Sequence, residues 1–579
     1  MSTELLTTAV DCFWLFFGGV LVFFMQTGFT MVEAGFTRSK NTGNIIMKNI
    51  VDFMFGSIIY WFIGYGLMYG EGNGFIGIPF GDMFMNGMAG AENMDYTALF
   101  FQTVFCATSA TIVSGAMAER TNFKAYCIYS AAISLFIYPI AGHWVWGGGW
   151  LSELGFHDFA GSAIVHMLGG TLSFVGAAIL GPRIGKYTKD GKVNVIPGHN
   201  ILIGALGVLI LWVGWFGFNP ASTGGLSDGG VQVAAKVFIT TNLAACAAAI
   251  TTMFFTWIRY GKPDVSMTLN GVLGGLVAIT APCDLVTPFA SIIIGVVGAI
   301  LMCLAIPFID TKLKVDDPVG AISVHGICGL WGTIAVGLFA SDTSAGAELL
   351  GLFYGGGLKA LGVQALGAVS LIAWAAIIGS ILFVVLKKAG LLRAKPQEEI
   401  EGLDSTEHGL ASAYADFLPI SATTMGGVTT ETIDVTDLRD KKLAPVIGGA
   451  KETGGRYTKL TIMCKEDRFA ILKDAMSQIG VTGMTVSHVM GCGTQKGKAG
   501  QYRGVKIDMN LLPQLQVDIV VSTVPPELVV EAAKKALYTG EYGDGKIFLY
   551  DVENVVRIRT NETGIAALDN EENRNLPVK

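Results

Sequence analysis

Asp158-Phe-Ala-Gly161-Ser-Ala-Ile-Val165-His166 and Asp317-Pro-Val-Gly320-Ala-Ile-Ser-Val324-His325 are two copies of one motif, and this repeat decides the fold. Each copy runs on to a further glycine, so the shared pattern is D-x-x-G-x-x-x-V-H-x-x-x-G. Both copies open a long apolar stretch of sequence. Ionisable side chains inside such stretches are costly to bury and are usually there for a function.

The apolar residues around these motifs are concentrated in one part of the chain. Of the 579 residues, 51% are hydrophobic and 15% are charged, whereas a soluble protein carries about 25% charged residues. The shortage of charged residues lies between residues 10 and 386, and the rest of the chain has the composition of an ordinary soluble protein. We therefore predict a membrane part followed by a soluble part.

The composition gives no support to several other classes of protein. The net charge of −7 gives no reason to expect a nucleic-acid partner. The nine cysteines form no C-x-x-C pair, so we predict neither a metal site nor a disulfide framework. The first residues lack the basic segment of a cleavable signal peptide.

Apolar runs long enough to cross a bilayer number eleven. They begin near Phe13, Ile50, Tyr96, Ala125, Phe159, Ile201, Val231, Met267, Phe289, Val319 and Tyr354. Lys and Arg follow the odd-numbered runs and are scarce after the even-numbered ones, and cytoplasmic loops are the ones that carry these residues. The expected fold is a polytopic α-helical membrane protein with eleven transmembrane helices in the lipid bilayer of a bacterial-type inner (plasma) membrane. Its N-terminus would lie outside and its C-terminus in the cytoplasm.

The two motif copies should run through the membrane in opposite directions, because an odd number of crossings separates them. Inverted repeats, here five helices plus five with one more added, place a transport site near the midplane. Each histidine lies eight residues after its aspartate, or roughly 12 Å along a helix, so His166 and His325 should meet near the bilayer centre. The alternative is two unrelated histidines packed in a bundle, and the symmetry of the pair favours a functional one.

Aromatic residues suggest what passes through the membrane part. Phe101 and Phe105 share one helical face, and Trp146 lies in the outer sequence His143-Trp-Val-Trp146-Gly-Gly-Gly149. Aromatic faces attract small cations. An aromatic belt at the membrane surface is the alternative, and composition alone favours the belt.

Five stretches of sequence resemble the Amt (Amt/Rh) family of ammonium transporters. They are MVEAGFTRSKN (31–41), VWGGGW (145–150), DFAGSAIVH (158–166), GWFGFNPAS (214–222) and DDPVGAISVHG (316–326), and the likeness covers residues 10–415. The resemblance implies a homotrimer with one ammonium pore per subunit and no enzymatic activity. We expect electrogenic transport in which NH4+ is split and NH3 and the proton pass separately. An apolar pore penalises an intact ion, and neutral imidazoles can relay a proton.

The resemblance also implies which residues form the pore, from the outside inwards. They are an outer recruitment site (Phe105, Trp146 and Ser222), a stacked gate beneath it (Phe101 and Phe218) and a pore-lining pair (His166 and His325). Two further residues have supporting places: Asp158 would be a structural acid below the outer site, and Asn219 would follow the gate phenylalanine.

The soluble end contains a tail, a linker and a folded domain. We place the membrane domain at 1–387, the cytoplasmic tail and linker at 388–456, the folded domain at 457–565 and a polar tail at 566–579. The folded domain reads as strand, helix, strand, strand, helix, strand, which predicts an α+β ferredoxin-like unit. Its expected strands are 459–464, 484–490, 516–521, 546–552 and 555–560, and its expected helices are 467–479 and 525–537.

Glycine-rich basic loops in this domain predict a phosphate-binding site. Val481–Val486, the loop 491–497, Tyr502–Gly504 and Gly543–Lys546 together resemble the PII signal proteins across 457–565. That family forms trimers, binds ATP or ADP between subunits and plugs Amt pores with an extended loop, here 493–511. The resemblance implies that the nucleotide is bound by Thr485, Gly491, Gly493, Gln495, Gly543, Asp544, Gly545, Lys546, Arg557 and Arg559.

Three positions depart from the PII pattern. Thr494 replaces a phosphate-binding arginine, which favours ADP, and Gln514 stands where a lysine binds 2-oxoglutarate. Ile507 replaces the tyrosine that some relatives modify. The regulatory ligand is thus expected to be ADP, ATP or both, with no cofactor for transport itself.

Two functions remain open at this point. The first is an ammonium transporter regulated by its own PII-like domain, with a separate PII protein as a further candidate partner. The second is an ammonium sensor that signals through the fused domain with little net flux.

Overall fold

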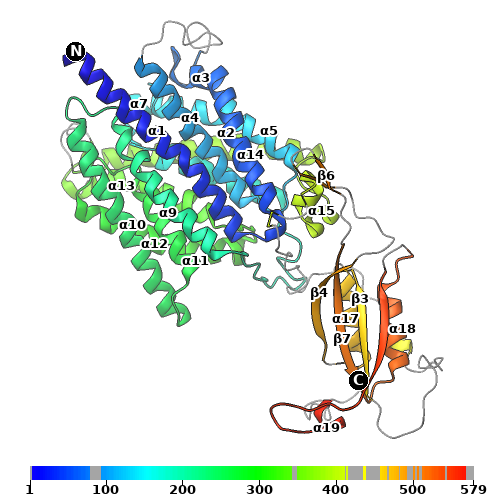
Figure 1. The fold of residues 1–579 in the computed structure, drawn as a ribbon. Helices are drawn as coiled ribbons and strands as arrows, with labels where there is room; N and C mark the ends of the chain where they lie inside the picture. The colour runs from blue at the N-terminus through cyan, green and yellow to red at the C-terminus, as the bar shows by residue number, and fades with distance from the viewer. Residues whose placement is uncertain are drawn as a thin grey trace. The chain divides into compact units, whose positions relative to one another are not determined.

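The chain divides into two compact units, Met1–His408 and Gly409–Lys579. The structure is a computed structural model. It describes residues 3–78, 93–341, 349–410, 413–414, 434–438, 457–465, 468–481, 483–491, 500–502, 505–507, 512–540 and 544–568. Figure 1 shows the first unit as a bundle of long helices and the second as a small sheet with helices against it.

The first unit contains the apolar helices that the sequence predicts. Among the described residues, ten helices are long and apolar enough to cross a membrane, and α11 (Val265–Ile279) is a shorter apolar helix that adds an eleventh. The other crossing segments are α1 (Thr3–Phe36), α2 (Thr42–Ile59) with η2 (Tyr60–Gly64) and α3 (Tyr65–Tyr69), α4 (Asn93–Ala116), α5 (Phe123–Ala132) with η3 (Ile133–Ile137) and α6 (Tyr138–Val145), η4 (Ser162–Met167) with α8 (Leu168–Leu180), α9 (Ile201–Phe218) with η5 (Pro220–Thr223), α10 (Gly230–Tyr260), α12 (Pro288–Phe308) with η6 (Ile309–Leu313), η7 (Ile322–Ile327) with α13 (Cys328–Phe339), and α14 (Lys359–Lys388). Short elements connect them: η1 (Ser39–Asn41), β1 (Gly72–Asn73), β2 (Ile76–Gly77), α7 (Trp150–Glu153) and η10 (Leu352–Tyr354).

Glycines join the first half of the bundle to the second. α1 and α9, the first and sixth crossing helices, pack against each other. A Cβ atom at Gly35 would stand 2.5 Å from the backbone nitrogen of Gly204, and one at Gly217 would stand 2.9 Å from the carbonyl oxygen of Gly18. Larger side chains would push the two helices apart, and small residues at such seams are typical of membrane helix pairs.

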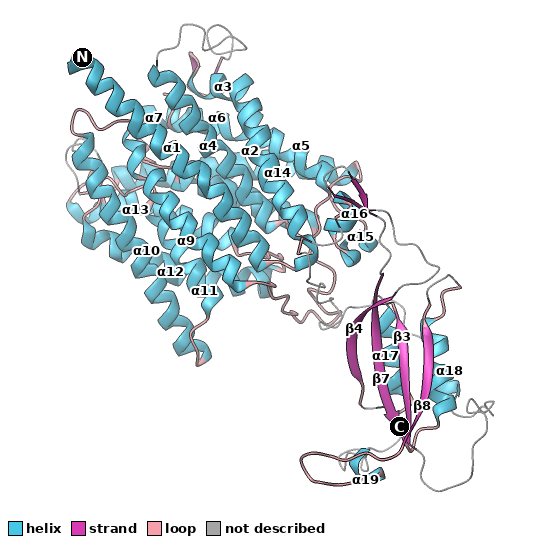
Figure 2. Cartoon of the chain, in the orientation of Figure 1, coloured by secondary structure: helices cyan, strands magenta, loops and turns pink. Residues whose placement is uncertain are grey.

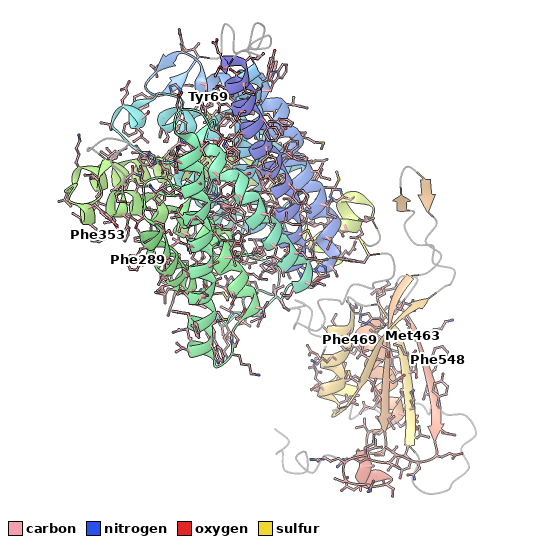
Figure 3. All side chains as sticks on the ribbon, turned by 60° about the vertical axis from the view of Figure 1, so that its left-hand side comes forward. Tyr69, Phe289, Phe353, Met463, Phe469 and Phe548 are labelled. Carbon is pink, nitrogen blue, oxygen red and sulfur yellow. The ribbon has the colours of Figure 1, made fainter. Side chains whose placement is uncertain are left out.

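Large apolar side chains cover the outside of the bundle, as expected for a surface that faces lipid. Phe289 and Phe353, which Figure 3 labels, are 72% and 64% exposed. In a soluble protein such a surface would mark an interaction site or an aggregation hazard.

The polar tail after α14 folds back onto the bundle through α15 (Pro396–Glu401) and α16 (Leu403–His408). The Asp404 carboxylate accepts hydrogen bonds from the backbone nitrogens of Gly43 at 2.9 Å and Asn44 at 2.8 Å, in the first turn of α2. A negative charge at a helix N-terminus is stabilising. The first part of the segment expected as tail and linker is therefore packed as part of the first unit.

The second unit is a four-stranded antiparallel sheet with two helices. The strands are β3 (Tyr457–Cys464), β4 (Thr485–Gly491), β7 (Leu512–Val521) and β8 (Lys546–Val552), in the order β4-β7-β3-β8. The helices are α17 (Phe469–Gln478) and α18 (Pro526–Leu537), and α19 (Ile565–Leu568) follows. This order confirms the predicted ferredoxin-like domain, and Figure 2 shows the strands side by side with α17 and α18 against them.

The predicted strand at 555–560 is wrong. This segment forms a turn, in which the backbone nitrogen of Arg557 donates to Glu562 and that of Asn561 donates to Arg557, both at 2.9 Å. A strand needs a neighbouring strand to satisfy its backbone groups. Among the described residues no strand pairs with this segment, whose one bridge joins Val556 to Thr563 within the turn.

Alternation along the strands separates a core face from an open face. Leu460, Ile462 and Cys464 on β3 are buried in the core with the helices, and so are Leu515, Val517 and Ile519 on β7. The open face, which we define as Lys459, Thr461, Met463, Gln516, Phe548 and Tyr550, borders a hollow of ≈ 480 Å³. Figure 3 labels Met463 and Phe548 on this face and Phe469 on α17.

A short piece of the expected linker docks on the second unit. η12 (Thr436–Leu438) and the residues before it pack against α17 and α18. Val435 is fully buried and its backbone nitrogen donates to Gln478 Oε1 at 3.0 Å. Lys535 Nζ donates to Asp437 Oδ1 at 2.9 Å. This part of the expected linker therefore belongs to the second unit.

Val435→Asn is expected to release this segment. Removing the buried side chain costs about 2 kcal/mol, so the open form should become at least tenfold more populated, by roughly 1.4 kcal/mol per decade. Limited proteolysis within 434–438 should accelerate accordingly, because cleavage follows the open population. Thr436→Asn places the same side chain at an exposed neighbouring position and should leave the rate unchanged. If both variants were cleaved at the same rate, the docking of residues 434–438 through Val435 would be contradicted.

Candidate functional site

The aspartates that begin the two motif copies cap the helices that follow them. Asp158 accepts hydrogen bonds from the backbone nitrogens of Gly161 at 3.0 Å and Ala163 at 2.9 Å. Asp317 accepts in the same way from Gly320 at 3.0 Å and Ile322 at 2.8 Å. The first N–H groups of a helix have no partner within the helix, so these carboxylates determine where η4 and η7 begin. Burial raises the pKa of both carboxyls above the usual value, and the backbone N–H groups oppose that rise.

The first glycine of each copy makes a turn that other residues adopt only with strain. Gly161 has φ of 111° and Gly320 has φ of 84°, in the region that favours glycine. The two helices that follow, η4 and η7, are π-helices. Single turns of π-helix are common at functional sites, and here each carries the histidine of its copy.

The two histidines meet inside the bundle. His166 Nδ1 lies 3.2 Å from His325 Nδ1, and the rings are stacked with centroids 5.2 Å apart. His166 is fully buried and His325 is 5% exposed. Within the described part of the chain, His166 Nε2 has no hydrogen-bond partner. One ring nitrogen of each imidazole thus faces the other, and the remaining nitrogen of His166 is available to a ligand.

The last glycine of each copy brings the two histidines together. A Cβ atom at Gly170 would stand 2.2 Å from the backbone nitrogen of Gly326, the residue after His325. A Cβ atom at Gly329 would stand 2.9 Å from the backbone nitrogen of Met167, the residue after His166. Each repeat therefore receives the backbone of the other in a space that only a glycine leaves open. All the fixed positions of the repeated motif except the valine now have a structural reason.

Stacked aromatic rings lie next to His166. Phe105 and Phe218 are stacked with ring centroids 4.0 Å apart and planes 17° apart, and the Phe218 ring is 5.6 Å from that of His166. Phe101 contacts Phe105 at 4.6 Å in a tilted arrangement. The expectation that Phe101 stacks on Phe218 is therefore wrong. Phe101 and Phe105 are one turn apart on α4, and the placement of α4 relative to α9 decides which of them meets Phe218.

The other residues expected at the outer end have identifiable partners. Trp146 Nε1 donates to the carbonyl oxygen of Asp158 at 2.7 Å, and the Trp146 ring lies 6.2 Å from that of Phe105. Ser222 Oγ donates to the carbonyl oxygen of Phe218 at 2.8 Å. Asn219 Nδ2 donates to Thr241 Oγ1 at 3.0 Å, which anchors the end of α9 to α10. The hydrogen bond from Trp146 links the outer aromatic ring directly to the first motif copy.

Trp215 belongs to this site although the sequence did not single it out. Its ring stacks on His166 with centroids 5.2 Å apart, and its Nε1 donates to Thr280 Oγ1 at 2.9 Å. Trp215 and Phe218 are three residues apart on α9 and so share a helical face. That spacing within GWFGF was the available signal.

Three further charged side chains are buried in the bundle and were not expected at the site. Glu33, Lys48 and Asp52 are all at least 97% buried, and Glu33 borders the same small cavity as His325. Charged residues inside apolar runs are functional candidates by default. The positions of Glu33 and Asp52 in apolar sequence were the signal that could have found them, whereas Lys48 precedes the second apolar run.

Comparison with known proteins assigns the bundle to a family. The sequence profile described as Ammonium Transporter Family matches residues 13–414. The chain belongs to the ammonium transporter family. Ammonium transporter Amt2 of Archaeoglobus fulgidus is 46% identical over 71% of this chain and 89% of its own length. This is a family of transporters and not of enzymes.

Two solved structures resemble this member of the ammonium transporter family. One, named "Sensor Amt Protein", is 39% identical with a TM-score of 0.65, over 70% of this chain and 100% of its own. The other, the crystal structure of Candida albicans Mep2, is 28% identical with a TM-score of 0.62, over 67% of this chain and 87% of its own.

The chain carries a P-II nitrogen regulatory domain after its membrane part, because the profile described as Nitrogen regulatory protein P-II matches residues 457–562. The residues expected to bind nucleotide fall into two groups on this domain. Thr485 and Gly491 begin and end β4, at one edge of the sheet. The second group lies around β8, at the other edge of the sheet. Asp544 and Gly545 precede this strand, Lys546 begins it, and Arg557 and Arg559 follow it.

The two groups lie at opposite edges of one copy of the sheet. Three strand spacings of about 4.8 Å separate the edges, which is roughly 14 Å. Some members of the second group have local tasks. Asp544 Oδ2 accepts from the backbone nitrogen of Thr539 at 2.8 Å, and Arg557 Nη1 donates to Glu562 Oε2 at 2.8 Å. Gly545 has φ of 111°, and a Cβ there would stand 1.8 Å from the Met463 carbonyl oxygen.

Several expectations fall outside the described residues. Gly493, Gln495 and Gly543 are among them, as is Thr494. Within the expected extended loop at 493–511, the structure describes the antiparallel pair β5 (Gly500–Tyr502) and β6 (Val505–Ile507). Among the described residues, no group of three or more His, Cys, Asp or Glu side chains could hold a metal ion.

Proposed function

We propose that this ammonium transporter recruits NH4+ at Phe105, Trp146 and Ser222, outside the pore, and passes NH3 and the proton separately along His166 and His325. The observation that carries the proposal is the buried contact between the two imidazoles, 3.2 Å apart, beneath a stacked phenylalanine pair. An ion without a counter-charge is costly in such surroundings. A pair of neutral imidazoles can accept and donate a proton while NH3 passes as a neutral molecule. Transport by this route is electrogenic.

The proposed gate is the pair Phe105 and Phe218, with Phe101 behind it. Asp158 supports the outer end through its hydrogen bonds to the start of η4, and Asn219 supports the end of α9. The protein works as a homotrimer in the inner membrane of a bacterial-type cell, with its N-terminus outside and its P-II domain in the cytoplasm. The Lys and Arg distribution around the crossing helices supports this orientation.

The P-II domain senses ADP or ATP and regulates the pore. We place the nucleotide between neighbouring copies of the domain, with the β4 edge of one copy facing the β8 edge of the next. The separation of the two residue groups by the width of the sheet supports this arrangement. The partly apolar open face, on which Phe548 and Tyr550 are 43% and 52% exposed, supports the burial of this face against other copies. The matching three-fold axes would hold the domain at high local concentration near the pore.

A second candidate function is ammonium sensing with little net flux. The observation in its favour is the likeness to the structure named "Sensor Amt Protein". In that case, ammonium occupancy of the pore would be reported through the P-II domain.

Ammonium-evoked current in proteoliposomes separates the two functions. The full chain is compared with a chain that ends at Tyr414, with and without ADP or ATP on the side of the P-II domain. Self-regulated transport requires current from both chains and a nucleotide effect in the full chain alone. Absence of current from both, with ammonium changing the nucleotide affinity of the full chain, would establish a sensor instead.

A further inference from the structure

A small cavity connects His325 with a buried carboxylate. The cavity has a volume of ≈ 20 Å³, and its polar walls are His325, Glu33 and Asn270. Such a space holds about one water molecule, which needs two or more polar partners. Phe29 and Val32 on α1 line the apolar side. The side chains around the cavity therefore place a proton acceptor next to the inner histidine.

Glu33 is held so that one of its oxygens stays available to the cavity. Ser114 Oγ donates to Glu33 Oε2 at 2.8 Å, and Asn49 Nδ2 approaches the same oxygen at 3.4 Å. In the described part of the chain, Glu33 Oε1 receives no hydrogen bond from another residue. The side chain as a whole is 3% exposed, so solvent does not reach it freely.

Lys48 supplies the opposite charge. It is fully buried, and its Nζ lies 5.0 Å above the ring of Tyr126. No hydrogen-bond acceptor reaches this Nζ among the described residues. Glu33 and Asp52 interact with it electrostatically. An ammonium group buried in this way is costly unless opposite charges surround it, so Lys48 makes an ionised Glu33 tolerable inside the bundle.

The polar residues continue towards the end of the bundle that the proposed orientation places in the cytoplasm. Asn44, Lys48 and Asp52 recur every four residues along α2, so they share one face of the helix. Asn44 Nδ2 contacts His408 Nε2 at 3.0 Å, at the end of the tail helix α16. Asp52 Oδ2 accepts a hydrogen bond from the Tyr126 hydroxyl. A polar stripe thus leads from the level of the cavity to the tail.

We propose that Glu33 accepts the proton released at His325 and, with Lys48, starts a proton exit that is separate from the path of ammonia. This inference rests on the proposed function. In the step itself, an N–H bond of the His325 imidazolium breaks and an O–H bond forms on the Glu33 carboxylate, through a water in the cavity. The imidazole returns to its neutral form, and the carboxylic acid later loses the same proton towards the stripe on α2. No electron transfer and no further reactant are needed.

The test measures charge and ammonia separately in the same proteoliposomes containing the full chain. Current reports the proton, and alkalinisation of the vesicle interior at zero net current reports NH3. For Glu33→Gln we expect the current to fall by at least about tenfold, because a positioned acid or base contributes factors of this size or more, while alkalinisation persists. Glu153→Gln changes an exposed carboxylate on α7 and should keep both signals.

Ser114→Ala keeps the Glu33 carboxylate and removes its best hydrogen-bond donor. We expect it to lower the ratio of current to alkalinisation in the same direction, by a smaller factor. If Glu33→Gln does not fold, Ser114→Ala serves as the test. Elution as a trimer in size-exclusion chromatography shows whether each variant is folded.

The outcomes distinguish this inference from the proposed function. Wild-type current in folded Glu33→Gln, or wild-type ratios in Ser114→Ala, would overturn the role of Glu33 and leave twin-histidine transport intact. Loss of both current and alkalinisation in folded Glu33→Gln would also overturn it, since Glu33 would then be structural. If the wild-type chain itself carries NH3 without current, charge-separated transport fails, and the proton exit fails with it.

Discussion

Gly170→Ala is expected to abolish ammonium transport. The new Cβ would stand 2.2 Å from the backbone nitrogen of Gly326 and 2.4 Å from its Cα atom. Both are main-chain atoms, so no side-chain rotation relieves the clash and the two motif copies must separate. When groups that act together in a reaction are displaced by one ångström, the rate can fall by about 100-fold. The contact between His166 and His325 should be lost, and with it the relay of the proton.

The measurement is ammonium-evoked current from equal amounts of reconstituted protein. Gly362→Ala is the matched control, because a Cβ at Gly362 meets nothing within 4 Å. An alanine at this exposed position in the first turn of α14 should be neutral or slightly stabilising, by at most about 0.5–1 kcal/mol. Current close to wild type in Gly170→Ala would mean that the histidine pair does not need the close approach of the two repeats.

Arg183→Met is expected to have the largest effect on stability. Arg183 Nε and Nη2 donate to Asp316 Oδ2 and Oδ1 at 2.8 and 2.9 Å, and Nη1 donates to Glu119 Oε1 at 3.0 Å. All three side chains are at least 97% buried. Removing the guanidinium leaves buried carboxylates without this partner, and breaking a buried ion pair in this way costs about 3–5 kcal/mol.

Chemical unfolding of the purified protein in mixed micelles would measure this loss. Lys395→Met is the control, because the Lys395 side chain is 82% exposed and lies 3.7 Å from Glu398. A surface pair of this kind contributes about 0–1 kcal/mol. If Arg183→Met and Lys395→Met lowered the free energy of unfolding by the same amount, burial would not explain the strength of the Arg183 ion pairs.

The same cluster predicts how stability depends on pH. Burial by itself raises the pKa of Glu119, but Arg38 and Arg183 outweigh that effect and lower the pKa from 4.5 to about 2. The unfolded chain therefore binds the proton first as the pH falls. The stabilisation is complete above pH 4.5 and is lost between about pH 4.5 and 2. Arg183 also lowers the pKa of the Asp316 carboxyl. Arg183→Met should therefore be less sensitive to pH over this window, and equal sensitivity would contradict the assignment to this cluster.

Two features of the membrane part were predictable for a clear physical reason. Backbone groups in lipid must be satisfied within the segment, so the length and polarity of each apolar run identify the crossing helices without tertiary information. The repeated motif was equally informative, because its acid, glycines and histidine all act locally or through symmetry. His166 and His325 were therefore found as a pair, and the structure gives the distance between them.

The pairing of side chains across helices was not predictable in the same way. Phe101 and Phe105 lie on one face of α4, and sequence alone does not tell which of them meets Phe218. Glu33 and His325 are far apart in the chain and share a cavity because of the way α1 and η7 pack. The segment 555–560 alternates like a strand and forms a turn, because no neighbouring strand pairs with it among the described residues.

The sequence by itself determined that the chain crosses a membrane through two related halves, and that a P-II domain follows. Those properties depend on local hydrophobicity, helix capping and strand alternation. Only the tertiary structure decided which phenylalanines stack, which carboxylate shares a cavity with His325, and that the expected nucleotide residues lie on opposite edges of one sheet. Such contacts depend on how whole helices and strands cross, and that geometry is set by the packing of the entire fold.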